Sequence, residues 1–534
     1  MNPQTAAHFE EGHDTGTVPL PRPLKQKIKD ALVAVSMANL CFLLVSFDLL
    51  SDADRLFDLL PVTTSTLLAL TTNIAGLALI IWLGIRAVRR FPNRWFQVPA
   101  HLLFILLLLF PVDFIRIKYF HVADYEILKL FEQPVIMACA VAALALVVWQ
   151  HRLAARTAAI LAAILSPLAL MVLGKIALVC VGLATIKECR EPSTWLPLNP
   201  VPHGQPRVVW IIFDCTDYRL AYEQRPANVQ LPEFDRLRSE SLFADHAYSP
   251  GSCTILSMPA LIYGQVVSAA DTSDTCDLTV TFADTGATTG CTGLPSIFTK
   301  ARQLGFNNAV VGWFIPYGRL VGRDLNFCEW YPYPPFEPGR ADTYVANVRQ
   351  QFLSLGETFW LRHLFANVHR DSLQVSLSVV TNASYGLTLL HLPAPHKPGV
   401  YLADKDQLTF WPRLSKVAGY FNNLVLADRE FGKLRRAMET SGEWDNTWII
   451  LSSDHAWSES NLYDHKLDPR VPFIVHAPGA NDPIAYANPF NTVLTDALIL
   501  AILQKQVTNH QDVANWLDAH RPAQVAMPVV GPEP

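Results

Sequence analysis

Residues 208–217 read VVWIIFDCTD. Six apolar residues, mostly β-branched or aromatic, precede Asp214, which is the pattern of a buried strand that ends in a polar group. Similar apolar runs recur along the chain and alternate with helix-like stretches. They read NAVVGWF at 308–314, YGLTLLHL at 385–392, TWIILSS at 447–453 and VPFIVHA at 471–477. This alternation predicts an α/β domain with a mostly parallel central sheet, which we place at residues 206–534.

The ends of these strands carry acids and imidazoles. Asp214 ends the first strand, Asp454 and His455 follow TWIILSS, and His391 and His396 lie in and beyond YGLTLLHL. Functional groups of an open α/β sheet gather beyond the carboxyl ends of its strands, and Asp and His are zinc ligands. The pattern predicts that these groups converge on one cation. Turn or cap residues for Asp214 and the Asp-His pair, and a packed strand-end histidine for His391, are the alternatives.

Residues 248–264 read YSPGSCTILSMPALIYG and contain the candidate nucleophile. Thr254 precedes an apolar, helix-like stretch. If a helix begins there, the free backbone N–H groups of its first turn would lie close to Thr254. A threonine hydroxyl is a poor nucleophile at neutral pH unless a base or a metal activates it. Thr254 is therefore predicted to lie beside the acids and imidazoles, with a simple helix N-cap as the alternative.

The first third of the chain is predicted to lie in a membrane. The whole chain is 51% hydrophobic and only 17% charged, and the excess apolarity lies before residue 190. Candidate spans, most of them near the ~20 residues that a bilayer requires, run from about Ala31 to Leu50, Ser65 to Ile85, Val98 to Ile115, Val135 to Trp149 and Ala158 to Ile186. We expect five crossings in a helical domain at 1–190, followed by a proline-rich linker at 191–205.

Positive charges between the spans predict the orientation, because Lys and Arg near span ends favour the cytoplasmic side. They are Lys25, Lys27 and Lys29; Arg86, Arg89, Arg90 and Arg94; and Arg152 and Arg156. They occupy alternate loops, so the N-terminus is expected in the cytoplasm and the α/β domain on the opposite side. This predicts a multi-pass protein of a bacterial-type inner (plasma) membrane with a periplasmic or extracellular catalytic domain.

These features together resemble the alkaline phosphatase superfamily, in the branch of sulfatases, membrane-anchored phosphoethanolamine transferases and lipoteichoic acid synthases. LPEFDRLRSESLFADHAYSP at 231–250 is similar to the family's segment before the nucleophile, and DHKLDPRVPFIVHAPG at 464–479 to its closing strand. The resemblance implies a sulfatase-like α/β fold and a metal site. The ligands that the resemblance implies are Asp214, Thr254, Asp454 and His455. The metal it implies is zinc or manganese, with calcium as a further candidate.

Three further histidines are expected to bind substrate. HLPAPHKP at 391–398 resembles the H-x(4)-H-x-P segment of the phosphoethanolamine transferases and contains His391 and His396. His465 falls ten residues after His455, where that family has a substrate-binding histidine. We expect His396 and His465 to bind the phosphate and to protonate the leaving oxygen. His396 and His465 are alternatively ligands of a second metal.

The residues around Thr254 favour phosphoryl over sulfuryl chemistry. Sulfatases have a motif of the form C-x-P-S-R-x-x-x-L-x-G, whose cysteine is converted to formylglycine. Counted back from Gly264, that pattern places Thr254 at the cysteine, Leu256 at the proline and Met258 at the arginine. The related membrane-anchored transferases use a threonine at this position, which makes Thr254 the expected nucleophile.

The sequence thus predicts a metal-dependent transferase that moves a phosphoethanolamine- or phosphoglycerol-like group through a phospho-threonine. The expected donor is a phospholipid and the acceptor an envelope glycan or lipid, and a net charge of −5 gives no reason to expect nucleic acid. A sulfatase-like hydrolase of phosphate or sulfate esters is the alternative. An inactive sulfatase-like membrane protein is the second alternative.

Overall fold

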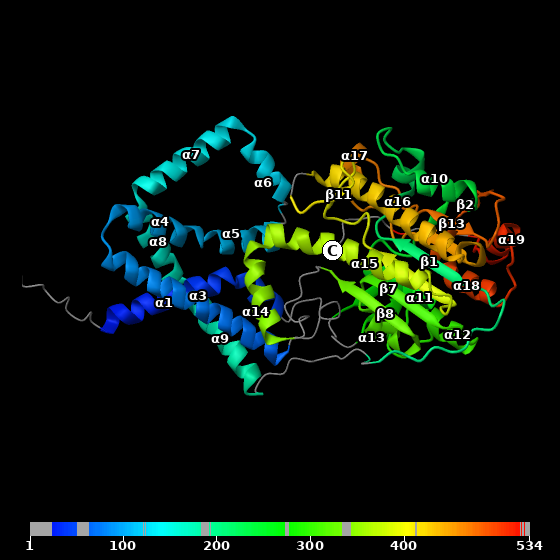
Figure 1. Cartoon of the computed structure of the whole chain (residues 1–534), viewed down its shortest axis with the longest axis horizontal. Helices are drawn as coiled ribbons and strands as arrows, with labels where there is room; N and C mark the ends of the chain where they lie inside the picture. Colours follow the sequence, from blue (N-terminus) through cyan, green and yellow to red (C-terminus); the bar gives the residue numbers. More distant parts are fainter. Residues whose placement is uncertain are drawn as a thin grey trace, which may run out of the picture.

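The computed structural model describes residues 24–50, 63–120, 122, 124–182, 192, 194–272, 277–333, 343–411, 414–523, 525 and 528. A helical region formed by the first part of the chain lies beside a larger α/β domain (Figure 1). Parts of two predicted segments lie outside the described residues, namely 183–186 of the last expected span and positions 191 and 193 of the linker.

The helical region contains nine α-helices among the described residues. They are α1 (Leu24–Cys41), α2 (Leu43–Leu50), α3 (Thr64–Arg90), α4 (Arg94–Leu106), α5 (Leu109–Ile115), α6 (Asp124–Phe131), α7 (Pro134–Trp149), α8 (His151–Ile164) and α9 (Ser166–Cys180). Two helical stretches, Thr64–Arg90 and Arg94–Ile115, are long and apolar enough to cross a membrane, and a third crossing results if α7 and α8 count as one bent span.

The expected first and last spans are each divided into two helices. The chain breaks at Phe42 between α1 and α2 and at Leu165 between α8 and α9, while α7 and α8 meet at an angle of 92°. Apolar composition does not predict where a helix breaks, because a broken helix and a straight helix contain the same types of residue. Five crossings therefore remain a prediction.

An eight-stranded sheet forms the centre of the α/β domain, in the order β14-β2-β13-β12-β1-β9-β7-β8. Its strands are β1 (Val208–Phe213), β2 (Leu242–Ala244), β7 (Asn308–Phe314), β8 (Phe327–Pro332), β9 (Leu387–Leu392), β12 (Trp448–Ser452), β13 (Phe473–His476) and β14 (Ile484–Tyr486). Only β13 runs against the others, since it pairs antiparallel with both β12 and β2. The predicted mostly parallel α/β sheet is confirmed.

Helices cover both faces of this sheet. The remaining helices of eight or more residues are α10 (Pro232–Ser239), α11 (Thr254–Tyr263), α14 (Tyr344–Leu353), α15 (Glu357–Val380), α16 (Lys416–Ser441), α18 (Thr495–Leu503) and α19 (His510–His520). Shorter helical segments are α12 (Ile297–Gln303), α13 (Tyr317–Val321), α17 (Asn461–Asp464) and the 3₁₀ turn η4 (Ser354–Gly356). Three small sheets lie apart from the main one, namely β4-β5-β6 (Val267–Asp271, Thr279–Phe282, Thr288–Gly290), β15-β3 (Phe490–Asn491, Ala247–Tyr248) and β10-β11 (Tyr401–Leu402, Gln407–Leu408).

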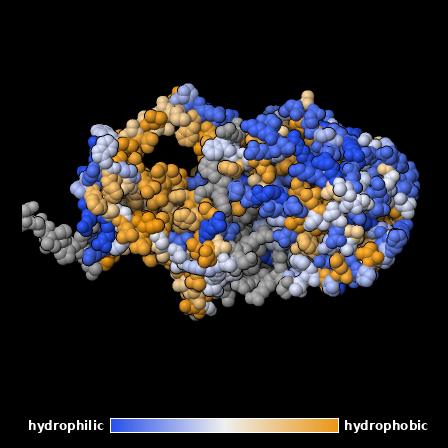
Figure 2. Space-filling model, viewed as in Figure 1, coloured by the Kyte–Doolittle hydropathy of each residue, from blue (hydrophilic) through white to orange (hydrophobic). Residues whose placement is uncertain are grey.

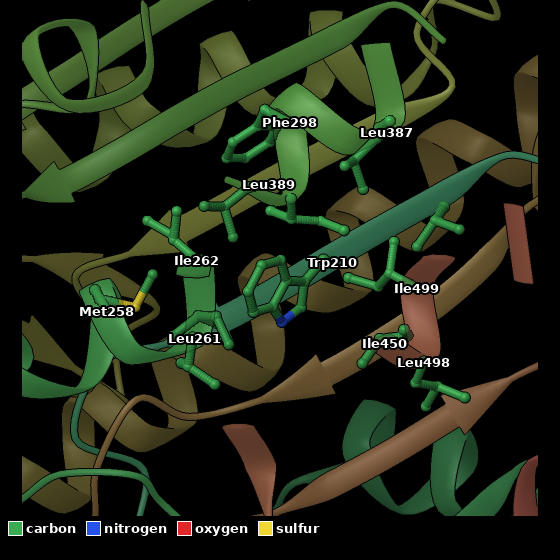
Figure 3. Close-up of a cluster of buried hydrophobic side chains, with 14 of the residues drawn as sticks. Trp210, Met258, Leu261, Ile262, Phe298, Leu387, Leu389, Ile450, Leu498 and Ile499 are labelled. Atoms are coloured by element: carbon green, nitrogen blue, oxygen red, sulfur yellow. The ribbon is translucent and has the colours of Figure 1, made fainter. Parts of the chain in front are cut away.

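Alternate residues of β1 point into two separate cores. Val208, Trp210 and Ile212 pack on one face with α11, α12 and α18. Figure 3 shows Trp210 at the centre of this layer, among Met258 and Leu261 of α11 and Ile499 of α18. The other residues of β1 pack on the opposite face with α10, α15 and α16. A strand buried on both faces is a continuous apolar run, which is why VVWIIF lacks polar alternation.

Candidate active site

The candidate site lies at the carboxyl ends of two neighbouring parallel strands. Asp214 follows β1, and Asp454 and His455 follow β12; the register pairs Ile212 with Ser452, so both strands end at the same level. All three side chains are fully or almost fully buried. The sheet topology therefore brings together acids that are separated by more than two hundred residues in the sequence.

Thr254 is the first residue of α11 and points at this group. Its Oγ1 donates to Oδ2 of Asp454 at 2.8 Å and lies 3.3 Å from Nε2 of His455. The residue that caps α11 is Cys253, in extended conformation and without a side-chain cap bond. Thr254 is therefore not the N-cap of its own helix, and its hydroxyl instead contacts Asp454 and His455.

The hydrogen bonds of His455 fix which ring nitrogen faces the site. Nδ1 lies 2.9 Å from the carbonyl oxygen of Ala456, which can only accept, so Nδ1 carries the proton. In the neutral ring Nε2 then presents its lone pair to the acids, 3.5 Å from Oδ1 of Asp214 and 3.6 Å from Oδ2 of Asp454. This is the tautomer that metal-binding histidines adopt.

The donor set fits a divalent cation. Asp214, Asp454 and His455 each offer one ligand atom, and these atoms lie within 4.8 Å of one another. Two ligands bound to one tetrahedral zinc ion at about 2.0–2.1 Å lie about 3.3–3.4 Å apart, close to the separations from Nε2 of His455. Among the described residues, Asp454 has ion-pair contacts only with the imidazoles of His391 and His455. Within the described residues, the buried carboxylate of Asp454 thus has no lysine or arginine partner. A bound cation would balance its negative charge.

Trp313, which the sequence did not single out, orients Asp214. Its indole Nε1 donates to Oδ2 of Asp214 at 2.6 Å. Trp313 is fully buried near the end of β7 and packs against Phe365 of α15, Tyr333 and His396, with ring centroids 6.0, 5.6 and 5.9 Å away. In the sequence, Trp313 reads as an ordinary core residue of an apolar strand.

A second missed residue, Ser453, joins the ends of β1 and β12. Its hydroxyl donates to the carbonyl of Phe213 at 2.7 Å and accepts from the backbone N–H of Thr216 at 2.8 Å. Cys215, two residues beyond the end of β1, has a positive φ of 66° and donates its N–H to Oδ1 of Asp454 at 3.3 Å. Its sulfur lies 3.6 Å from Nε2 of His455. These contacts hold the two strand ends in one arrangement.

His391 forms a wall of the site. It is completely buried, its Nδ1 lies 2.7 Å from the hydroxyl of Tyr317, and its Nε2 lies 4.0 Å from Oδ2 of Asp454. Among the described residues, Nε2 has no hydrogen-bond partner. Burial lowers the pKa of His391 to about 4, so the ring is neutral at pH 7.

His396 also lies at the site. Nδ1 of His396 lies 2.6 Å from the carbonyl of Lys397, and the residue forms a second group of candidate ligands with Asp214 and Cys215. His465 is exposed at the end of α17, with a positive φ of 63°. Within the part of the chain that the structure describes, no hydrogen bond joins the His465 ring to the site, so its substrate role stays a prediction.

Comparison with known proteins identifies similarity over the α/β domain. The sulfatase family model matches residues 206–517. No curated protein is a significant match. Among solved structures, Ps i-CgsB is 16% identical with a TM-score of 0.41, covering 58% of this chain and 76% of that protein.

Two other similar structures have different reported activities. The phosphonate monoester hydrolase of Agrobacterium radiobacter is 11% identical with a TM-score of 0.39, covering 60% of this chain and 79% of that one. The lipoteichoic acid synthase LtaP from Listeria monocytogenes is 13% identical with a TM-score of 0.35, covering 57% and 75%. At these values the similarity carries no information about the activity of this chain.

Proposed function

Because the chain belongs to the sulfatase family, within the alkaline phosphatase superfamily, we propose that it is a membrane-anchored, metal-dependent transferase. It moves a phosphoryl-containing head group, phosphoethanolamine- or phosphoglycerol-like, from a phospholipid to an envelope glycan or lipid. The observation that carries the proposal is the Thr254 hydroxyl, which is buried and hydrogen-bonded to Asp454 at 2.8 Å beside the candidate ligands. A hydroxyl in that position is the nucleophile of a two-step displacement.

Asp214, Asp454, His455 and Thr254 would hold the metal. Nitrogen and oxygen donors at these separations suit zinc or manganese, whereas calcium prefers six to eight oxygen ligands. The cation would act as a Lewis acid that neutralises charge on the phosphoryl oxygens and favours the alkoxide form of the hydroxyl.

In the first step, Oγ1 of Thr254 attacks the phosphorus of the donor, and its proton passes to Oδ2 of Asp454, which already accepts its hydrogen bond. The bond between phosphorus and the diacylglycerol oxygen breaks as the Thr254–phosphorus bond forms. The leaving oxygen takes a proton, and His396, when protonated on both ring nitrogens, is our candidate to supply it. Diacylglycerol leaves and the head group stays on Thr254.

His391 is suited to bind the phosphoryl group rather than to exchange protons. Its ring stays neutral, and if the Tyr317 hydroxyl donates to Nδ1, the proton of His391 lies on Nε2, directed into the site. In the second step, an acceptor hydroxyl attacks phosphorus and its proton passes to His396, which gave up a proton in the first step. The Thr254–phosphorus bond breaks, and Oγ1 of Thr254 recovers its proton from Asp454. Positioning and electrostatics supply most of what this chemistry requires.

We also propose five crossings, with the N-terminus in the cytoplasm and the α/β domain in the periplasm. Arg89 of α3 pairs with Asp30 of α1 at 2.5 Å, and Arg152 of α8 donates to Gln97 of α4 at 3.0 Å. These contacts gather the positively charged ends of four helices on one side, which supports a cytoplasmic assignment for that side. In this arrangement α8 and α9 together form the fifth crossing despite the break at Leu165.

Hydrolysis of phosphate or sulfate esters by the same residues is the second candidate, favoured by membership of a family named for a hydrolase. To separate the two, the full-length protein is reconstituted with mixed phospholipids, and diacylglycerol and free head group are measured with and without a membrane glycolipid acceptor. Acceptor-dependent diacylglycerol release, lost in Thr254→Ala and kept in Thr440→Ala, is the expected result. Release of free head group at an acceptor-independent rate would establish a hydrolase, and no release from any lipid would contradict a phospholipid donor.

A further inference from the structure

One helix of the α/β domain leaves that domain and packs on the helical region. α14 (Tyr344–Leu353) lies in the sequence between β8 and β9, both central-sheet strands. In space it lies across the beginning of α3, at the side of the helical region nearest the α/β domain (Figure 1). The linker at 191–205 is thus not the sole connection between the two parts.

Polar side chains fix α14 on α3. Asn73 of α3 donates to the carbonyl of Val348 at 3.0 Å and to the side chain of Gln351 at 3.2 Å, and Gln351 donates back to the carbonyl of Thr66 at 3.0 Å. Thr72 and Tyr344 share a hydrogen bond of 2.5 Å. Gln351 is fully buried. Because buried polar groups lose free energy when unpaired, reciprocal bonds of this kind specify one docked position.

Within the part of the chain that the structure describes, the opposite face of α14 is exposed. Val345 is 73% exposed and Phe352 52% exposed, and Arg349 between them is also exposed. Their spacing of four and three residues places them on one side of the helix. Among the described residues, Arg349 has no ion-pair partner. Two large apolar side chains that flank a cation, beside a helix apolar enough to cross a membrane, match the surface of an interfacial helix.

We propose that α14 is an interfacial helix that seats the catalytic domain on the phospholipid bilayer. Val345 and Phe352 insert among the upper acyl-chain carbons, and Arg349 contacts the lipid phosphates. The expected depth for such a face is about 5–10 Å, at the boundary between head groups and acyl chains. The inference rests on the membrane anchoring in the proposed function and not on its reaction.

A short run of contacts connects α14 to the candidate metal site. α14 continues through η4 into α15, where Leu364 packs with the core of the helical region. The next residue, Phe365, packs on Trp313 with ring centroids 6.0 Å apart, and Trp313 donates to Asp214. Two consecutive residues of α15 therefore face the two parts of the molecule. The orientation of the site relative to the bilayer is set by this helix pair.

The test uses the full-length protein in nanodiscs of phosphatidylcholine and phosphatidylglycerol in equal amounts. The photo-crosslinking residue p-benzoylphenylalanine replaces Val345 or Phe352, and lipid adducts are counted by mass spectrometry. Val141, exposed on α7, is the lipid-facing control, and Thr440, at the exposed end of α16, is the aqueous control. Adducts at 345 and 352 near the level of 141 are expected. Adducts no more frequent than at 440, with 141 labelled, would overturn the proposal.

A second arm tests Arg349. With the crosslinker at 345, phosphatidylglycerol is expected to be enriched among the adducts, and Arg349→Gln is expected to reduce this enrichment by up to about fivefold, the factor for one cation near an anionic surface. An unchanged lipid ratio would overturn the assignment of Arg349 to the phosphates. The adducts need no turnover and are expected equally in a Thr254→Ala background, so failure here is distinct from failure of the transferase reaction.

Discussion

The helical region and the α/β domain differ in how completely they bury their apolar side chains. In β1 every residue is buried, whereas none of the residues of the equally apolar α7 is buried. The surface of the helical region is accordingly mostly apolar and that of the α/β domain mostly polar (Figure 2). An apolar run therefore has two meanings, a core in water or a lipid-facing surface, and its length and neighbours distinguish them. The sheet places polar groups at its strand ends, and two stretches of the helical region are long and apolar enough to cross a membrane.

The largest effect is expected where the α/β domain concentrates buried charge. Asp454→Asn removes the carboxylate that accepts from Thr254 and faces His455. Turnover should fall by more than the ~10²–10³-fold that loss of a single oxyanion donor costs. Metal content, measured by inductively coupled plasma mass spectrometry, should fall with it. Full metal content and near-normal turnover would exclude Asp454 from the site.

A pair of core and surface substitutions sharpens the comparison directly. Trp210→Ala in β1 should lower the free energy of unfolding by about 3–5 kcal/mol, because it leaves a cavity between β1, α11 and α18. Val141→Ala in α7, where the side chain is 59% exposed, should change it by less than about 0.5 kcal/mol. Thermal unfolding in nanodiscs measures both. Equal losses would mean that α7 packs against protein instead of lipid.

The third expected effect lies at the junction of the two regions. Trp313→Phe keeps the aromatic packing on Phe365 and removes the indole N–H that orients Asp214. Loss of such a supporting bond weakens metal binding by about 10–100-fold. Competition with a chelator measures the zinc dissociation constant, and Trp95→Phe, on a strongly exposed tryptophan of α4, is the matched control. An unchanged constant would show that Asp214 does not depend on Trp313.

The smallest effect is a pH dependence of the α/β domain. Burial, together with His510 and Arg435, lowers the pKa of His476 to about 4, and the carbonyl of Glu240 opposes this shift only in part. The unfolded state therefore takes up a proton below pH 6.5 that the folded state refuses. Stability should fall by at most about 1.4 kcal/mol per pH unit between pH 6.5 and 4. His476→Gln should flatten this slope in unfolding curves at pH 7 and 5, and an identical slope would assign it to other groups.

The sequence predicted the parallel sheet and the meeting of Asp214, Asp454 and His455, because a buried strand run and a polar residue at its end are local signals. The place of Thr254 beside them was predicted from the start of its helix and from the family resemblance instead. Parallel strands then bring these ends together without further information. Trp313 escaped notice because its role depends on which strands are neighbours, β7 beside β9 and β9 beside β1. A tryptophan in an apolar strand otherwise indicates only packing.

His465 and α14 show what spacing alone does not determine. His465 has the expected ten-residue separation from His455 in the sequence, but residue spacing does not fix the direction of the loop between them, so its substrate role stays a prediction. The docking of α14 depends on Asn73 and Gln351, polar residues of ordinary helical sequence whose pairing becomes visible only in space. Likewise, the apolar pattern of the sequence does not predict the helix breaks at Phe42 and Leu165.

The central claim is that Thr254 carries the transferred group. The most direct measurement is peptide mass spectrometry of the metal-loaded, detergent-purified protein after brief incubation with mixed phospholipids, with Thr254→Ala and Thr440→Ala in parallel. A mass increment is predicted on the peptide that contains Thr254, absent from the first variant and present in the second, and its size identifies the head group. An unmodified Thr254 peptide in metal-loaded protein that still consumes phospholipid would contradict a covalent phospho-threonine.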